Sequence, residues 1–66
     1  MTVAKTIELA ATSSEGFEAA IAEAVGKAHQ TLRNVEGAWV KEQKVLITDG
    51  SITGYRVHLE VTFVLD

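Results

Sequence analysis

The sequence has 66 residues, of which 47% are hydrophobic, no cysteine, and a formal net charge of −3. This length predicts a single domain, and the lack of cysteine excludes disulfides and thiolate metal sites. The acidic balance, with only six scattered Lys and Arg residues, argues against nucleic-acid binding. No apolar run approaches the ~20 residues of a membrane span, and the first residues lack the apolar segment of a signal peptide. We therefore expect a cytoplasmic protein without membrane or nucleic-acid partners.

Self-association is the expected source of stability for so short a chain. A domain of this size buries only about 60% of the surface that its unfolded chain exposes. Small domains usually add disulfides, a metal or oligomerisation to a limited core. Because one helix and a few strands cannot hide the 47% apolar residues internally, we expect an oligomer.

Residues 3–11 are predicted to form the first strand, because Val3, Ile7 and Leu9 share one parity. Thr12 or Ser13 is then expected to cap a helix. Glu15 stands three residues after Thr12, which is the spacing of a capping box. The first strand is therefore predicted to end before Thr12.

The helix is predicted to run to about Asn34. Its apolar residues follow the i, i+3, i+4, i+7 spacing of one helical face: Phe17, Ala20, Ile21, Ala24, Val25, Ala28 and Leu32. This face is rich in alanine, so the helix can lie close to a sheet. Residues 34–37 are predicted to form the turn that leaves the helix.

Two further strands are predicted at residues 38–48 and at about 53–65. The Asp49-Gly50 pair between them is a strong hairpin signal. In the last strand apolar and polar residues alternate from Tyr55 to Leu65, which predicts one apolar and one polar face. In the strand at 38–48, parity places Trp39 with Lys41, Gln43, Val45 and Ile47.

These elements give an α+β fold of β-α-β-β order, with a three-stranded antiparallel sheet and one helix packed on one face. The odd-numbered residues of the last strand should point toward the helix. No second helix is left to cover the other face, so a bare sheet face that includes Trp39 is expected to be an assembly surface.

The chain as a whole resembles the dodecin family of small β-α-β-β proteins. None of the segments that carry this resemblance is a catalytic motif by itself. The order, spacing and total length of these segments are, taken together, specific to the family. The segments that carry the resemblance are Ile7-Glu8-Leu9, Thr12-Ser13, Ala19-Ala20, Ala24, Val40-Lys41-Glu42 and the alternating run from Tyr55 to Phe63.

The resemblance implies one dodecin-like domain over residues 1–66 and a hollow homododecamer built from trimers. It also implies binding and storage of a flavin, such as riboflavin, FMN or lumichrome, without redox chemistry on a substrate. An enzyme is the least expected alternative, because no nucleophile or acid–base pair is organised in the sequence.

The flavin pocket of the family uses a tryptophan at the start of the second strand and a glutamine on the third. Alignment on Val40-Lys41-Glu42 places Gly37 at the tryptophan position, and alignment on Tyr55 places Arg56 at the glutamine position. Gly37, Trp39 and Arg56 are therefore the candidate ligand-binding residues.

Trp39 lies one strand period, about 7 Å, beyond Gly37 and faces the same way. It can offer its ring to a ligand or fill a subunit contact, and we favour the contact slightly. Arg56 donates but cannot accept hydrogen bonds, so it favours a phosphate or carboxylate.

The resemblance also implies an alternative, because some dodecins that lack the pocket tryptophan bind calcium. The Tyr55-Arg56 pair and the neighbourhood of Glu42 and Gln43 are more similar to that branch. Calcium takes six to eight oxygen ligands, and one chain has no Asp/Glu cluster of EF-hand spacing, so the metal ligands stay unassigned between subunits. The alternative function is a calcium-binding or purely structural shell that has lost flavin binding. A transition-metal site is not expected, because His29 and His58 are far apart.

Overall fold

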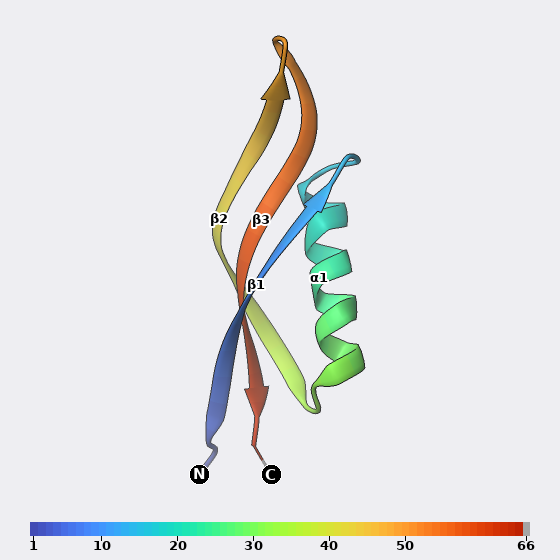
Figure 1. Cartoon of the computed structure of the whole chain (residues 1–66). Coiled ribbons are helices and arrows are strands. Elements are labelled where there is room, and N and C mark those ends of the chain that lie inside the picture. Colours follow the sequence, from blue (N-terminus) through green and yellow to red (C-terminus); the bar gives the residue numbers. More distant parts are fainter. Residues whose placement is uncertain (66) are drawn as a thin grey trace.

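The computed structural model describes residues 1–65, so residue 66 of the predicted 1–66 domain lies outside the described part. The elements are β1 (Ala4–Ser13), α1 (Phe17–Thr31), β2 (Val35–Thr48) and β3 (Ser51–Val64). β3 is the central strand and pairs antiparallel with both β1 and β2. α1 lies along one side of this strongly twisted sheet (Figure 1). The predicted β-α-β-β fold with a three-stranded antiparallel sheet and one helix is confirmed.

The core lies between α1 and the odd-numbered face of β3, as the alternation in the sequence predicted. Val57, Leu59 and Val61 have no exposed surface. The buried helix residues that pack with them are Ala20, Ala24 and Ala28. Alanine has a short side chain, so α1 can approach the sheet closely. Phe63, which the alternation also placed under the helix, is only half-buried, because it pairs with Lys5 and Val35 where α1 has already ended.

The helix starts later than predicted, and the capping box does not form. Thr12 and Ser13 belong to β1, where they pair with Arg56 and Tyr55. Gly16 is the N-cap residue of α1, and no side chain caps the first turn. The hydroxyl of Ser13 instead accepts a hydrogen bond from the Glu15 N–H at 3.0 Å. The prediction failed because the strand ladder satisfies the backbone groups of residues 12 and 13.

The helix also ends before Asn34, its predicted end, and the turn that follows it is shorter than predicted. α1 ends at Thr31, and β2 already begins at Val35. Asn34 has a φ angle of 60°, a left-handed conformation that asparagine tolerates better than most residues. Its carbonyl accepts the Val64 N–H at 3.1 Å. One left-handed residue therefore redirects the chain, and residues 35–37 are free to join the sheet.

The predicted hairpin between β2 and β3 is confirmed at Asp49-Gly50. Both residues have positive φ angles, 51° and 79°, as a type I′ turn requires. However, the pairing of β2 shifts between Val40 and Glu42. Such a bulge inserts one extra residue and reverses the side-chain parity beyond it. The predicted grouping of Trp39 with Gln43 and Val45 is therefore wrong.

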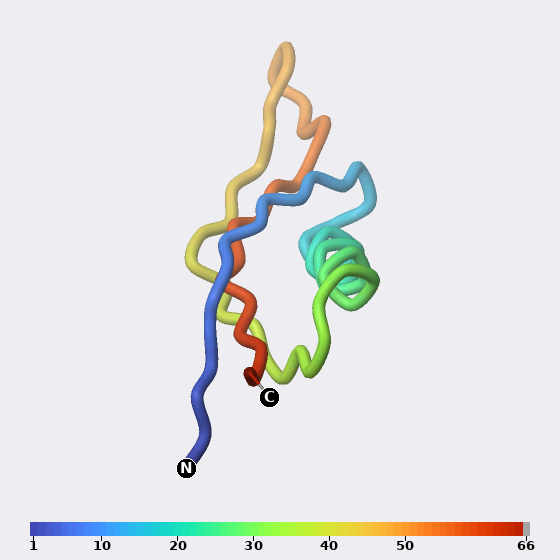
Figure 2. The backbone as a smooth tube through the Cα atoms, turned by 60° about the horizontal axis from the view of Figure 1, so that its bottom comes forward, coloured from blue at the N-terminus to red at the C-terminus, as the bar shows by residue number. Residues whose placement is uncertain are grey.

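The chain is elongated, and one end of the sheet lies far from the core. Its principal extents are 51 × 19 × 13 Å and its radius of gyration is 13.6 Å, against about 11 Å for a compact chain of 66 residues. The exposed area of 4756 Å² also exceeds the roughly 4100 Å² typical of a monomer of this mass. β1 ends opposite Tyr55, so the tip of the β2–β3 hairpin extends beyond it (Figure 2).

Candidate ligand-binding face

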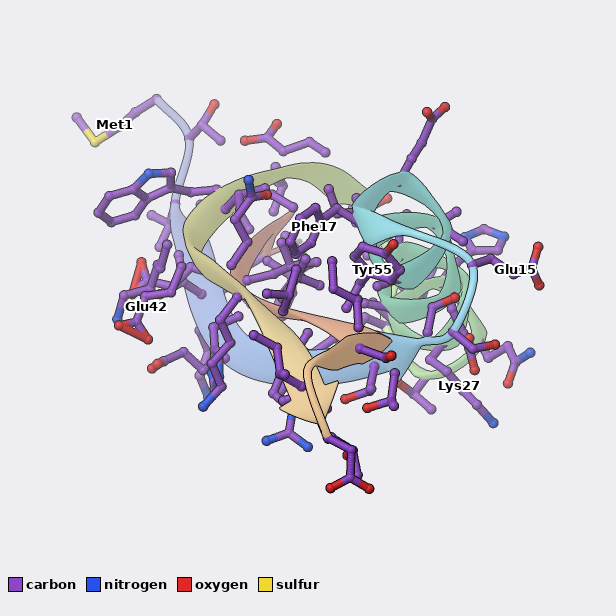
Figure 3. All side chains as sticks on the ribbon, turned by 90° about the horizontal axis from the view of Figure 1, so that it is seen from above. Met1, Glu15, Phe17, Lys27, Glu42 and Tyr55 are labelled. Carbon is purple, nitrogen blue, oxygen red and sulfur yellow. The ribbon has the colours of Figure 1, made fainter. Side chains whose placement is uncertain are left out.

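The sheet face opposite α1 carries all the candidate ligand-binding residues, and we call it the open face. Cross-strand partners project to the same side of a sheet, so the pairing of the strands fixes its members. Figure 3 shows Glu42 on this side, pointing away from α1. The open face comprises Thr6, Glu8, Ala10 and Thr12 of β1, Gly37, Trp39, Glu42 and Lys44 of β2, and Arg56, His58, Glu60 and Thr62 of β3.

The residues of the open face lie in rows across the three strands. One row is Glu8–Glu60–Trp39, and we call it the carboxylate row. Lys41, in the bulge of β2, places its Nζ atom 3.4 Å from Oε1 and Oε2 of Glu8 and 3.7 Å from Oε2 of Glu60. The hydrogen bond and charge of Glu8, supported by Glu60, raise the pKa of Lys41 above its ordinary value. The ammonium group thus offsets the repulsion between two carboxylates that face each other.

Trp39 stands at the edge of the carboxylate row with most of its indole in solvent. The residue is 64% exposed. Gly37 lies two residues earlier on the same face, opposite Thr62. A Cβ atom built on Gly37 would meet no atom within 4 Å. The two candidate residues therefore border open space above the sheet, with one aromatic ring available there.

Arg56 lies in a second row, Thr12–Arg56–Lys44, which we call the cationic row. The Nε–H group of Arg56 donates to Oγ1 of Thr12 at 3.0 Å. This hydrogen bond fixes the direction of the guanidinium group. Lys44 is exposed and directly opposite Arg56 in the ladder.

The structure brings Gly37 and Trp39 together but not Arg56. The partner of Trp39 is Glu60, four residues from Arg56 along β3, which corresponds to about 13 Å. Within one chain, Arg56 and the indole therefore serve separate parts of the open face. The sequence interpretation missed Lys44 and Thr12 as neighbours of Arg56. Lys44 was missed because the bulge reverses the side-chain parity of β2 before it. Thr12 was missed because it was assigned to a helix cap.

One hollow lies between the edge strand β1 and α1, and the described residues form no cluster of metal-binding side chains. A hollow of about 350 Å³ between β1 and α1 contains none of the three candidate residues; it is lined by Leu9, Ala10, Ala11, Thr12, Glu23, Ala24 and Lys27. Among residues 1–65, no three His, Cys, Asp or Glu side chains come together as metal ligands. In the same range, no helix is both long and apolar enough to span a membrane.

A family model, Dodecin, matches residues 3–66, almost the whole chain. The chain belongs to the dodecin family. Among curated dodecins, that of Thermus thermophilus is 44% identical over 64 residues, which cover 97% of this chain and 93% of the relative. A crystal structure of a variant of Thermus thermophilus dodecin has a TM-score of 0.92 at 42% identity, with 100% of this chain and 98% of that chain covered.

A second dodecin relative is the calcium dodecin of Mycobacterium tuberculosis. It is 36% identical over 63 residues, which cover 96% of this chain and 89% of the relative. Its crystal structure, described as having a calcium-binding site, has a TM-score of 0.83 at 37% identity and covers 97% of this chain and 91% of that chain. The fold of this chain is thus similar both to that of a dodecin and to that of a calcium dodecin.

Proposed function

We propose that the protein is a binding and storage module that forms a hollow dodecameric shell and takes a flavin of the riboflavin, FMN or lumichrome type. The observation that carries the proposal is the indole of Trp39. Trp39 is 64% exposed and lies on a sheet face that no helix covers. An aromatic ring in that position can stack on a planar ligand, and the space above Gly37 beside it is open.

Assembly is part of the proposal because the isolated chain leaves too much surface exposed. Its large exposed hydrophobic residues include Trp39, Ile47 and Ile52. Ile47 and Ile52 face each other near the hairpin tip, beyond the end of β1. A second copy that covers these residues would supply the apolar burial that the six-residue core lacks.

The binding site itself would also need more than one copy. Gly37 and Trp39 are separated from Arg56 by about 13 Å or more along the sheet. A single flavin that touches an indole and a guanidinium group at close range would therefore take them from two subunits. We propose no catalytic role for these residues, and a cytoplasmic location stays a prediction that cell fractionation would test.

Calcium binding is the alternative function. The relationship to calcium dodecin supports it. In this chain two carboxylates of the open face, Glu8 and Glu60, already share the ammonium group of Lys41. A calcium site of six to eight oxygens would thus require carboxylates from several subunits.

Riboflavin fluorescence separates the two functions. On titration of riboflavin with the purified oligomer, we expect the flavin emission to be quenched. Trp39→Leu should weaken this quenching, whereas Val3→Ala, which trims another exposed apolar residue, should leave it unchanged. Unchanged riboflavin emission would contradict the flavin proposal. Calcium-dependent stabilisation in the same preparation would then support the alternative.

A further inference from the structure

The Asp49-Gly50 turn between β2 and β3 combines a structural role with a reactive sequence. An aspartate that precedes glycine is prone to cyclise, because glycine has no side chain that hinders attack by its backbone nitrogen. Within residues 1–65, Asp49 is the one Asp or Asn that a glycine follows, since Asn34 precedes Val35. Chemistry of this kind is therefore directed to the turn of the hairpin.

The two groups that would react are exposed and hold no competing partner. Both residues of the turn lie at the surface. Within residues 1–65, the Asp49 carboxylate makes no hydrogen bond or ion pair, and the Gly50 N–H donates to no carbonyl. A two-residue turn is closed by its flanking residues, here Thr48 and Ser51, so the strand ladder makes no use of that N–H.

The hairpin tip, which we define as residues 47–52, is also held weakly. It lies beyond the end of β1, so its two strands pair only with each other. Ile47 and Ile52 are cross-strand partners there, but they are 63% and 54% exposed. A two-stranded segment with so little buried surface opens locally at low free-energy cost. Opening also releases Asp49 from a left-handed conformation, φ 51°, that residues with a Cβ atom disfavour.

We propose that Asp49 is a site of spontaneous isoaspartate formation. When the tip opens, the backbone nitrogen of Gly50 attacks Cγ of the protonated Asp49 side chain. The N–Cγ bond forms, the Cγ–OH bond breaks, and the N–H hydrogen leaves with the hydroxyl group as water. Water then opens the resulting succinimide ring at either carbonyl. Cleavage of the N–Cγ bond restores aspartate, whereas cleavage between the nitrogen and the main-chain carbonyl gives isoaspartate with a free α-carboxylate.

Isoaspartate lengthens the turn without changing the mass or net charge of the chain. The main chain then runs through Cβ and Cγ of residue 49, which adds one atom to a turn whose length fixes the register of the two strands. The pairs Thr48–Ser51 and Ile47–Ile52 thereby lose the loop that aligns them. The effect on assembly rests on the proposed function, in which a second copy covers Ile47 and Ile52. A chain with isoaspartate at residue 49 should therefore be excluded from the shell.

Prolonged incubation of the purified protein in heavy-oxygen water tests the modification site. After proteolysis, the peptide that contains residue 49 should yield a second species that accepts a methyl group from an isoaspartate methyltransferase and carries one heavy oxygen from ring hydrolysis. Asp49→Gly keeps a residue that favours positive φ but has no side chain to cyclise, so it should yield none. Asp49→Asn should react faster, because its neutral amide needs no protonation. No isoaspartate in the folded parent, while an unstructured peptide of residues 44–55 accumulates it, would overturn the proposal.

Two further comparisons test the opening of the tip and its consequence. Ile47→Ala weakens a cross-strand pair, so isoaspartate should form about twofold to fivefold faster than in the parent. Val3→Ala, which trims an exposed apolar residue outside the hairpin, should leave the rate unchanged, and an unchanged rate in Ile47→Ala would overturn the opening step.

Size-exclusion chromatography of the aged parent should place isoaspartate in the dissociated chains. Equal isoaspartate content in the oligomer and in dissociated chains would overturn the effect on assembly. A parent that never assembles, yet forms isoaspartate at residue 49, would refute the proposed shell and support the modification site.

Discussion

The rings of Phe17 and Tyr55 meet edge to face, with centroids 5.1 Å apart and planes inclined at 79°. Phe17 is the first residue of α1, and Tyr55 faces the helix from β3 near the end of β1. Figure 3 shows the two labelled side chains directed toward each other. The pair therefore fixes the start of the helix on the sheet, where no side chain caps the first turn.

A double-mutant cycle of Phe17→Leu and Tyr55→Leu should measure a coupling between the rings. Edge-to-face pairs contribute about 0.5–1.5 kcal/mol beyond the area they bury. We expect a coupling of this size in the free energy of unfolding by denaturant. Strictly additive effects of the two substitutions would show that the rings act only through separate apolar contacts.

Leu59→Ala should be among the most damaging substitutions in the chain. Leu59 has no exposed surface and is one of the three largest fully buried side chains. Removing such a side chain leaves a cavity and costs about 2–5 kcal/mol. Phe63→Ala is the control, because the half-buried ring of Phe63 should cost less than the 3–5 kcal/mol of a core phenylalanine. A larger loss for Phe63 than for Leu59 would show that the assembly buries the end of β3.

The sequence predicted the fold well where side-chain periodicity was regular. The alternation in β3 correctly placed Val57 and Leu59 under the helix, and the Asp49-Gly50 pair correctly located the hairpin. Prediction failed where backbone hydrogen bonding outweighed side-chain preference. Thr12 is a good helix cap by residue type, but the β1–β3 ladder extends through it. No local signal in the sequence reveals how far a partner strand continues.

The candidate site was harder to predict because it depends on one bulge. Trp39 and Gly37 precede the shift after Val40, so their common face followed from parity alone. Lys44 follows the shift, and a simple alternation placed it on the wrong side. The same shift gives Lys41 its position beside Glu8. A bulge depends on the partner strand, so these contacts required the structure.

Stability should decline at alkaline pH as Lys41 loses its proton. The neighbouring carboxylates raise the pKa of Lys41, so the folded state holds this proton more tightly than the unfolded state. The contribution is therefore fully present below the ordinary lysine range and is lost as the pH rises through the raised pKa. Unfolding temperatures between about pH 7 and pH 11 should fall less steeply for Lys41→Gln than for the parent.

Lys5→Gln is the matched control for that experiment. Lys5 lies in the same sheet, and within residues 1–65 no carboxylate lies within 4.0 Å of it. Its removal should leave the alkaline slope unchanged. If Lys5→Gln flattened the slope as much as Lys41→Gln, the effect would come from net charge and not from the carboxylate row.

Trp39→Glu should damage assembly more than secondary structure. The substitution removes an exposed indole and adds a third carboxylate beside Glu8 and Glu60. We expect light scattering to show loss of the large oligomer near twelve chains, while the far-ultraviolet circular dichroism changes little. Trp39→Gln, which removes the ring without adding charge, separates the two causes. A parent protein that is itself a stable folded monomer would contradict the proposed shell.

The double substitution Gly37→Trp with Arg56→Gln should tighten riboflavin binding. Gly37 has room for a side chain, because a Cβ atom there meets nothing within 4 Å, and a ring at this position could stack on the flavin. Glutamine offers both a donor and an acceptor, whereas arginine leaves a donor of the flavin ring unpaired at a cost of about 1–3 kcal/mol. For FMN the gain should be smaller, because Arg56→Gln also removes a cation from the cationic row.

Fluorescence titrations of the parent, both single variants and the double variant would measure these differences. Tight riboflavin binding by the parent would instead identify Trp39 as a sufficient stacking platform, and no binding by any of the four proteins would favour the calcium-binding or structural alternative.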